Sequence, residues 1–497
     1  MKSNYKTLVL CSTILGLSAC GGGGGSGPSV ATTQSTIASF NAIEKPHFER
    51  ILNAFDDPTP LYDFAYKGQE VANRGMIAYA VDLNEDGKDE LVLVLTVQPI
   101  DTKIRSTSKI YVFQLNETYK FIDVTSNFIA GPTVIDGSLS TATIVKLNNF
   151  PAMLFGDNED RPPLWAGQMR VMHKINGKYT ITTLNDMGRG DVPDAFIDRN
   201  GFVNVATASN GDPAVPNVYN NGLLSKSLSV LPPLSAGGFK LFSVNTSHSN
   251  HLIQTGIHDL FTLEGYVQDT LGVWQQIGSY QPFKKVATEP WSTGGTVDIL
   301  SDNGAYLIGT RSGAGIGTIC KIKYGESQVS AVVSHIPILK IKNYMPGQKL
   351  DWSSIEIPSA KLAVSTIENS QLKVTFPTIT NFQPNINYRN YTCKDINNDG
   401  LEDIVVNPIL TYPHDNQEAN PIVYIAKKDG SFAKASFSPL LYTISRPSHA
   451  NQASSLLGDF DGDKLPDIVM FGHDIGYGNL PSLYETIQFY KANKKIE

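Results

Sequence analysis

The chain has 497 residues, of which 9% are aromatic and 18% are charged, and its formal net charge is −7 at pH 7. A chain of this length and aromatic content can bury a large core. The negative charge and the lack of a long basic run argue against a nucleic-acid-binding protein, which would carry a basic stripe. Beyond the N-terminus no apolar stretch approaches about twenty residues, so we expect no transmembrane helix.

The first residues have the features of a bacterial lipoprotein signal. Two lysines precede an apolar stretch over residues 8–17, and the segment LSAC ends at Cys20. This segment resembles a lipobox, in which the cysteine becomes the acylated first residue of the mature chain. It predicts a signal peptide over residues 1–19 and a lipid anchor on Cys20; the alternative is a secretion signal without lipid. Gly21 follows in place of the aspartate that retains enterobacterial lipoproteins at the inner membrane, so we expect the outer membrane.

Residues 20–45 contain the run GGGGGSGP, which cannot pack a core and predicts a flexible tether. In the next ten residues the apolar side chains recur at helical spacing, namely Phe48, Ile51, Leu52 and Phe55. They follow a proline suited to a first turn, so the pattern predicts a short amphipathic helix. The rest of the chain has short apolar runs separated by Gly, Asn, Asp and Pro, which is typical of an all-β protein built of hairpins.

Three short acidic loops repeat one spacing of oxygen-bearing side chains. Loop 1 is residues 82–90 (DLNEDGKDE), loop 2 is residues 395–403 (DINNDGLED) and loop 3 is residues 459–467 (DFDGDKLPD). Calcium takes about six to eight oxygens, which a chain supplies locally by curling so that alternate side chains and one carbonyl point inward. The predicted calcium ligands, at loop positions 1, 3, 5, 7 (carbonyl) and 9, are Asp82, Asn84, Asp86, Lys88 and Glu90; Asp395, Asn397, Asp399, Leu401 and Asp403; and Asp459, Asp461, Asp463, Leu465 and Asp467.

Position 6 of each loop is where the curl is sharpest. Gly87 and Gly400 occupy it in loops 1 and 2, where a residue without Cβ takes a positive φ at low cost. Lys464 occupies it in loop 3, at a cost of roughly 1 kcal/mol if it is left-handed. We therefore expect loop 3 to bind weakly or to curl differently. Position 12, where an EF-hand has a bidentate glutamate, is apolar in all three loops, so they are not EF-hands.

With apolar residues before each loop and a strand-like run after it, these segments resemble FG-GAP or VCBS repeats, the calcium-binding blades of integrin-alpha-like β-propellers. The matching segments are AYAVDLNEDGKDELVLVL, YTCKDINNDGLEDIVV and LLGDFDGDKLPDIVMFG. In that family the loop joins two strands of one blade and the ion stiffens it. The resemblance implies an all-β propeller over residues 46–497, whose ring closes by pairing strands from both ends. The middle of the chain lacks the motif.

Counting apolar hairpin clusters predicts a seven-bladed propeller. The candidate blades lie near residues 71–125, 142–185, 194–231, 239–284, 295–341, 360–437 and 454–491. Two cysteines, Cys320 and Cys393, remain after processing of the N-terminus, and in an oxidising envelope they could form a disulfide. Because they lie in different candidate blades, two buried thiols are the alternative.

Three further patterns have weaker functional interpretations. His248, His251 and His258 have the spacing of zinc ligands, but no Cys or carboxylate cluster completes the set, so we interpret them as hydrogen-bonding loop residues. The tripeptide at residues 189–191, Arg-Gly-Asp, is one that integrins bind, and it also arises by chance. Residues 157–160 (DNED) are interpreted as a degenerate acidic loop.

These features predict an outer-membrane lipoprotein whose calcium-binding propeller binds a protein or glycan and does not catalyse a reaction. The competing predictions are a polysaccharide lyase or glycosidase built at the central channel, and a structural component of an envelope complex. The sequence has no G-x-S-x-G elbow and no H-E-x-x-H motif.

Overall fold

A computed structural model describes residues 47–493 with internal gaps, and these residues belong to one compact unit, Lys45–Glu497. The gaps are residues 56–61, 67–70, 158–167, 185–191, 198–202, 209–216, 221–222, 227–237, 247–248, 257–261, 270–273, 282, 293, 303, 310–319, 326–328, 339, 357–358, 381–387, 409, 412–421, 436–451 and 476–486. Within the described part, no helix is long and apolar enough to cross a membrane. Residues 1–46, with the predicted signal, Cys20 and the tether, lie outside the described residues.

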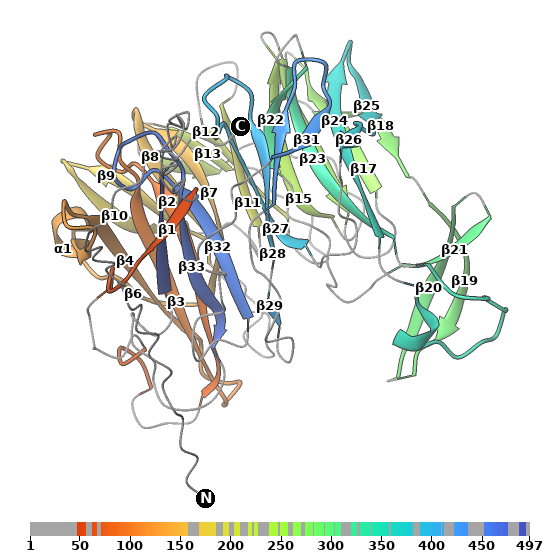
Figure 1. Cartoon of the computed structure of the whole chain (residues 1–497), viewed down its shortest axis with the longest axis horizontal. Coiled ribbons are helices and arrows are strands. Elements are labelled where there is room, and N and C mark those ends of the chain that lie inside the picture. The colour runs from red at the N-terminus through yellow and green to blue at the C-terminus, as the bar shows by residue number, and fades with distance from the viewer. Residues whose placement is uncertain are drawn as a thin grey trace, which may run out of the picture. The chain divides into compact units, whose positions relative to one another are not determined.

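The described residues are almost entirely β-structure (Figure 1). The helical elements among them are a single α-helical turn, α1 (Thr125–Phe128), and one 3₁₀ turn, η1 (Trp352–Ser354). The strands form antiparallel sheets in which neighbours along the chain are mostly neighbours in the sheet, as in a meander. This order follows from short connections, since strands joined by a tight turn pair with each other.

The middle of the chain forms sheets of this kind in succession. The first three consist of β7 (Leu139–Leu147), β8 (Phe150–Asp157), β9 (Arg170–Ile175) and β10 (Lys178–Thr183); β11 (Val192–Ile197), β12 (Val203–Ala208), β13 (Asn217–Asn220) and β14 (Leu223–Lys226); and β15 (Gly238–Thr246), β16 (Ser249–Gly256), β17 (Thr262–Gln268) and β18 (Trp274–Tyr280). A three-stranded sheet follows, made of β19 (Lys284–Pro290), β20 (Thr296–Asp302) and β21 (Ala305–Gly309).

Two further sheets complete the middle. One consists of β22 (Cys320–Tyr324), β23 (Val329–Ile338), β24 (Ser359–Glu368) and β25 (Gln371–Thr375). The other consists of β27 (Tyr388–Lys394), β28 (Asp403–Pro408), β30 (Ile422–Ala426) and β31 (Phe432–Lys434), with the short β26 (Ile379–Thr380) parallel to β31.

A ten-stranded sheet joins the two ends of the described chain. Its strands are β1 (Phe48–Ile51), β2 (Val71–Val81), β3 (Glu90–Pro99), β4 (Thr107–Leu115), β5 (Phe121–Asp123), β6 (Val134–Asp136), β29 (Leu410–Thr411), β32 (Gln452–Gly458), β33 (Asp467–Ile475) and β34 (Ile487–Ala492). The strand pairing between β2 and β33 is limited to two residue pairs, Arg74 with Ile475 and Gly75 with Asp474. The sheet therefore divides into two four-stranded groups, β2–β5 and β32-β33-β34-β1.

The predicted N-terminal helix is wrong, because that segment is a strand. Phe48 pairs with Ala492, and Ile51 pairs with Phe489, so β1 lies antiparallel on β34 at the other end of the chain. Leu52, which a helix would bury with Phe48, is 71% exposed, whereas Phe48 is 4% exposed. The free backbone edge of β34 outweighs the local helical spacing, since an unpaired edge strand offers a row of N–H and C=O groups. We call this β1–β34 pairing the closing seam.

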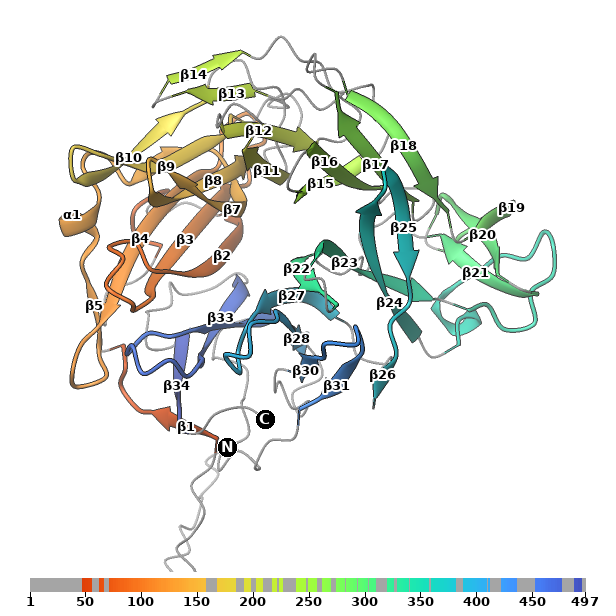
Figure 2. The same ribbon diagram turned by 90° about the horizontal axis from the view of Figure 1, so that it is seen from above.

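Successive sheets pack face to face through buried apolar clusters, and Figure 2 shows them following one another in chain order. One cluster joins β2–β5 to β7–β10, and others join β15–β18 to β22–β25, β22–β25 to β27–β31, β27–β31 to the closing seam, and the seam to β2–β5. Between them, β11 contacts both β7 and β15. Each sheet thus packs on the next and the last packs on the first, which confirms the predicted all-β propeller.

Seven groups of four strands occur among the described residues, and five of the candidate blade ranges agree with them closely. The fifth and sixth candidates are divided wrongly. Strands β19–β21 form a separate sheet, to which the segment after β23 returns by bridges such as Leu307 to Lys340. The next group is therefore β22–β25, and strand β24 joins it across that insert. Apolar hairpins look alike in sequence and do not show which one begins a sheet. The blade number of the whole chain stays a prediction.

Candidate metal centre

Loops 1, 2 and 3 occupy the same place in three different four-stranded groups. Each connects two adjacent antiparallel strands, β2 to β3, β27 to β28 and β32 to β33. In all three the residue before the loop pairs with loop position 9: Val81 with Glu90, Lys394 with Asp403, and Gly458 with Asp467. The repeated sequence spacing therefore corresponds to a repeated connection of eight residues between paired strands, with position 9 as the first residue of the second strand.

Loops 1 and 2 have matching hydrogen bonds within the loop. In loop 1 the two carboxylate oxygens of Asp82 accept hydrogen bonds from the backbone N–H of Asp86 and of Gly87, each at 3.0 Å. The Oδ1 atom of Asp86 accepts one from the N–H of Lys88 at 2.9 Å. In loop 2 the corresponding bonds run to Asp395 and Asp399, at 2.9–3.1 Å. The backbone is therefore wrapped around the carboxylates at positions 1 and 5.

Loop 3 has the same curl, although its glycine stands elsewhere. Lys464, at position 6, has a φ of 65°, as left-handed as Gly87 and Gly400 at 90°. Position 4 is left-handed as well in every loop, and loop 3 has Gly462 there with a φ of 81°. The curl is therefore not shifted in loop 3. The expected strain at Lys464 is present, while the glycine relieves position 4, which carries Glu85 and Asn398 in the other loops.

The carboxylates at position 9 lie beneath the loops. Glu90, Asp403 and Asp467 are fully buried, and each accepts a hydrogen bond from the backbone N–H of loop position 2. Burial raises the pKa of Glu90 and of Asp403 to about 7 and that of Asp467 to about 8, and backbone hydrogen bonds oppose the rise. Because an opposite charge favours the ionised form, a bound cation would lower these pKa values again.

The position-2 side chains fix the loops to the core. Leu83, Ile396 and Phe460 are each at most 2% exposed, and each belongs to an apolar cluster between two sheets. The Tyr179 hydroxyl also donates a hydrogen bond to the Leu83 carbonyl across to the next sheet, at 2.7 Å. The loops are thus exposed at their tips and anchored at position 2.

The structure brings the three loops together, although they come from the two ends of the chain. Asp89 of loop 1 makes two hydrogen bonds with the backbone of Asp459 in loop 3: its N–H donates to the Asp459 carbonyl at 2.7 Å, and its side-chain Oδ2 accepts from the Asp459 N–H at 2.9 Å. The same carboxylate pairs with Lys394, the residue before loop 2, at 2.9 Å. The Asn398 amide of loop 2 contacts the Lys464 carbonyl of loop 3 at 3.4 Å. These three loops therefore form one cluster, in which loop 3 contacts the closing seam because the Asp467 carboxylate accepts a hydrogen bond from the Ala492 N–H at 2.8 Å.

The donor set fits a hard cation. In loop 3 one carboxylate oxygen from each of Asp459, Asp461 and Asp463 lies within 4.8 Å of the others. Carboxylate, amide and carbonyl oxygens are the ligands that Ca²⁺ prefers. The buried carboxylates at position 9 also favour a nearby cation, since burying a charge without a partner is costly. Among the described residues, the structure thus gathers the Asp459, Asp461 and Asp463 carboxylates into one group, and the other predicted calcium ligands stay a prediction.

Lys491 of β34 contacts loop 3, and the spacing of the loop residues does not predict this contact. Its Nζ donates hydrogen bonds to Asp461 and to Asp463, the latter at 2.9 Å. Burial alone would lower the pKa of Lys491, but these hydrogen bonds outweigh it and hold the pKa above its ordinary value. A sequence signal for this contact is weak, because Lys491 lies well outside loop 3 and reaches it only through the pairing of β33 with β34.

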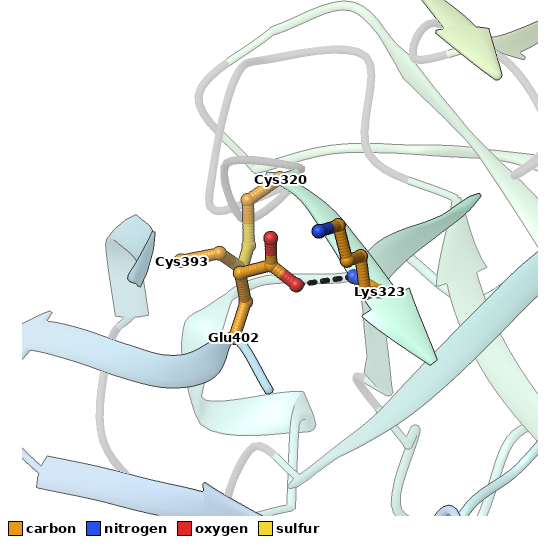
Figure 3. Close-up of a disulfide and its surroundings, with 4 residues drawn as sticks. All are labelled: Cys320, Lys323, Cys393 and Glu402. Carbon is orange, nitrogen blue, oxygen red and sulfur yellow. Dashed lines mark hydrogen bonds between the residues drawn. A yellow bond between two sulfur atoms is a disulfide. The ribbon is translucent and has the colours of Figure 1, made fainter. Parts of the chain in front are cut away.

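Cys320 of β22 and Cys393 of β27 form a disulfide between neighbouring sheets, with their Cα atoms 5.8 Å apart (Figure 3). Beside it, the carboxylate of Glu402 in loop 2 accepts a hydrogen bond from the backbone N–H of Lys323 (Figure 3). Loop 2 is thus held to the preceding sheet on both sides, because Cys393 stands two residues before Asp395.

The weaker patterns lie largely outside the described residues. His248, His258 and the Arg-Gly-Asp tripeptide at residues 189–191 are not described, and His251 is buried on β16. Asp157 is buried, and its carboxylate accepts hydrogen bonds from the backbone N–H groups of Ser138 and Gln168 at 3.0 and 3.1 Å. Residues 158–160 of that segment are not described.

Comparison with known proteins identifies a repeat in the C-terminal part of the chain. Residues 395–470, which contain loops 2 and 3, match the FG-GAP-like repeat family. This match confirms the repeat resemblance for that segment, while the integrin-alpha-like and lipoprotein parts of the prediction stay predictions. No curated protein matches the chain at a significant level.

Several solved structures are similar to this chain at low sequence identity. The α-L-arabinanase of Penicillium chrysogenum has 10% identity and a TM-score of 0.36, over 72% of this chain and 94% of that chain. A thermostable family-43 glycoside hydrolase has 12% identity and a TM-score of 0.29, over 65% and 99%. A mutant of Trypanosoma rangeli sialidase has 11% identity and a TM-score of 0.33, over 78% and 58%. At these scores the likeness carries no conclusion about activity. The chain is an all-β propeller with an FG-GAP-like repeat segment at residues 395–470.

Proposed function

We propose that this chain is a calcium-stabilised β-propeller that binds a protein or glycan at the bacterial outer membrane, where lipid on Cys20 anchors it. The observation that carries the proposal is one hydrogen-bonded loop, repeated at the same hairpin connection in three four-stranded groups and gathered into one cluster beside the closing seam. The same oxygen-lined loop is repeated where the first and last four-stranded groups meet. This placement supports a role for the ion in stabilising the fold.

In this proposal, calcium would be held by the side-chain oxygens at loop positions 1, 3, 5 and 9 and by the carbonyl at position 7. When bound, it supplies positive charge that offsets the clustered carboxylates and stiffens each loop. The loops hold one another through Asp89 and Asn398, so a stiffer loop also steadies its neighbour. The ligands of each site come from one local curl, as expected for a structural ion and not for a substrate-polarising one.

Calcium binding is tested by titrating the purified full chain and melting it with and without the ion. The wild type should bind two or three calcium ions and melt higher with calcium, because saturation at 100 times Kd adds about 2.7 kcal/mol per site. Asp399→Ala should lose one site. Asp429→Ala is the matched control, since Asp429 is an exposed aspartate that only closes a turn by accepting hydrogen bonds from Ser431. Identical melting in millimolar calcium and in chelator would contradict the proposal.

The anchor is tested in cells. Wild-type chain should incorporate labelled palmitate and sediment with membranes, whereas Cys20→Ser should do neither, because a secreted chain without the acylated cysteine has no lipid. Absence of label from the wild type would refute the anchor and leave calcium binding unaffected.

The binding role is tested against catalysis with the same purified chain. Immobilised glycans and cell-surface proteins should retain it without being converted. Steady release of product from a polysaccharide, abolished by a substitution outside the calcium loops, would instead favour a polysaccharide lyase or glycosidase. Co-purification in fixed stoichiometry with other envelope proteins, without ligand binding, would favour a structural component.

A further inference from the structure

Loop 3 differs from loops 1 and 2 in the residue at position 3. In loops 1 and 2 that residue is an asparagine, whose amide donates a hydrogen bond to the Oδ2 atom of the position-5 aspartate, at 2.9 Å from Asn84 and 3.0 Å from Asn397. Loop 3 has Asp461 there, which when ionised has no hydrogen to donate. Loop 3 therefore has one more negative charge among positions 1, 3 and 5, and it lacks the internal donor.

Lys491 supplies both the missing donor and the missing positive charge. Its Nζ donates to the Oδ2 atoms of Asp461 and Asp463. The Oδ1 atoms of the same two residues are already hydrogen-bonded to backbone N–H groups of the loop, at 3.1 and 2.8 Å. Lys491 thus contacts the carboxylate oxygens that the loop itself leaves for a cation. The Lys491 and Asp461 side chains are only 16% and 15% exposed, so water screens this contact weakly.

We propose that Lys491 is a built-in cation of loop 3, whose ammonium competes with Ca²⁺ for the Oδ2 atoms of Asp461 and Asp463. Loop 3 consequently takes up calcium after loops 1 and 2, and it keeps its curl when calcium is scarce. The inference rests on the proposed calcium binding of loops 1 and 2. It adds a lysine that sets the order in which the sites fill.

The surroundings of Lys491 give the displaced side chain a place to go. A cavity of about 390 Å³ lies beside it, lined by residues that include Tyr119, Asn116 and Glu117. The Nζ atom already lies 5.1 Å from the centre of the Tyr119 ring, a distance at which an aromatic face attracts a cation. Calcium can therefore enter the carboxylate cluster while the ammonium moves toward Tyr119.

Lys491→Met tests the competition, because methionine keeps most of the side-chain length and removes the charge. Calcium titration calorimetry of the full-length chain should show at least tenfold tighter binding at one site and little change at the others. Lys174→Met is the matched control, since Lys174 is a strand lysine whose Nζ lies 3.9 Å from the centre of the Phe150 ring, away from the loops. It should leave every calcium affinity within twofold of the wild type.

A second measurement needs no substitution. Acetylation of lysines in the wild-type chain, followed by mass spectrometry, should label Lys491 at least threefold faster in saturating calcium than in chelator, with Lys174 unchanged. Equal labelling of Lys491 in both conditions, or Lys491→Met with affinities equal to or weaker than wild type, would overturn the inference while leaving loops 1 and 2 as calcium sites. Absence of calcium binding in both proteins would overturn the inference and the proposed function together.

Discussion

Replacing Phe48 by alanine should weaken the closing seam. Phe48 is 4% exposed and packs in one apolar cluster with Tyr490 and Ala492 of β34 and with Leu457 of β32. Removing a buried phenylalanine costs about 3–5 kcal/mol, because the transfer free energy is lost and a cavity remains. Since β1 has only four residue pairs with β34, this loss falls on a small unit that can open without the rest of the fold.

Hydrogen exchange measures this local opening. A loss of about 3–5 kcal/mol corresponds to amide protection that is about 100- to 4,000-fold lower in β34, while β8 and β23 should keep theirs. Leu52→Ala is the matched control, because Leu52 is 71% exposed and should change protection hardly at all. A helix at this segment would place positions 48 and 52 on one face. Equal effects of the two substitutions would therefore refute the strand pairing described above.

Three further outcomes are expected. Without calcium, protonated Glu90, Asp403 and Asp467 favour the folded state below pH 4, and this contribution is lost as the pH rises through their folded pKa values of about 7 to 8. Calcium should consequently raise the melting temperature more at pH 8 than at pH 5.5, and an equal rise would contradict this account. The double variant Cys320→Ser, Cys393→Ser should lower the free energy of unfolding by up to about 4 kcal/mol in urea titrations, given a sequence separation of 73; an unchanged midpoint would argue against the disulfide. Lys464→Gly should stabilise calcium-free protein by up to roughly 1 kcal/mol in the same assay, because glycine relieves the left-handed φ of 65°; destabilisation would show that the lysine side chain itself contributes.

Local chemistry in the sequence predicted the loops and their curl. The spacing of Asp82, Asn84 and Asp86 follows from the geometry of alternate inward-pointing side chains. Their hydrogen bonds are also local, since the Asp86 N–H donates to the side-chain oxygens of Asp82 and Asn84. The strain at Lys464 could be foreseen for the same reason. The all-β class could also be predicted from the sequence, since short apolar runs between turn residues favour hairpins over helices.

Contacts between segments far apart in the sequence could not be predicted from local patterns. The spacing of Phe48, Ile51 and Leu52 is helical, and only the free edge of β34 makes a strand the better solution. Lys491 pairs with Asp461 because β33 and β34 are neighbours in the sheet, which no local pattern states. The fifth and sixth blade boundaries failed for the same reason, because an insert returns to the sheet β19–β21 before β24 joins its own sheet.

The loops lie where the two ends of the chain are brought together, and this pairing has a large cost in conformational entropy. Residues on the two sides of the seam, such as Glu49 and Asn493, are separated by 444 positions. Bringing such ends together costs about 5 kcal/mol of loop-closure entropy beyond a constant, from (3/2)RT ln n. The four-residue strand β1 can offset this entropy cost only if its surroundings are rigid, since mobile neighbouring segments would lose conformational entropy as well. Loops 1 and 3 contact each other directly where the group β2–β5 meets the group β32-β33-β34-β1, and loop 2 is tied to the sheet before it by a disulfide. Calcium in these loops would therefore add rigidity where closure of the fold is most expensive, and would add little in the middle sheets, which close through contacts between neighbours in sequence.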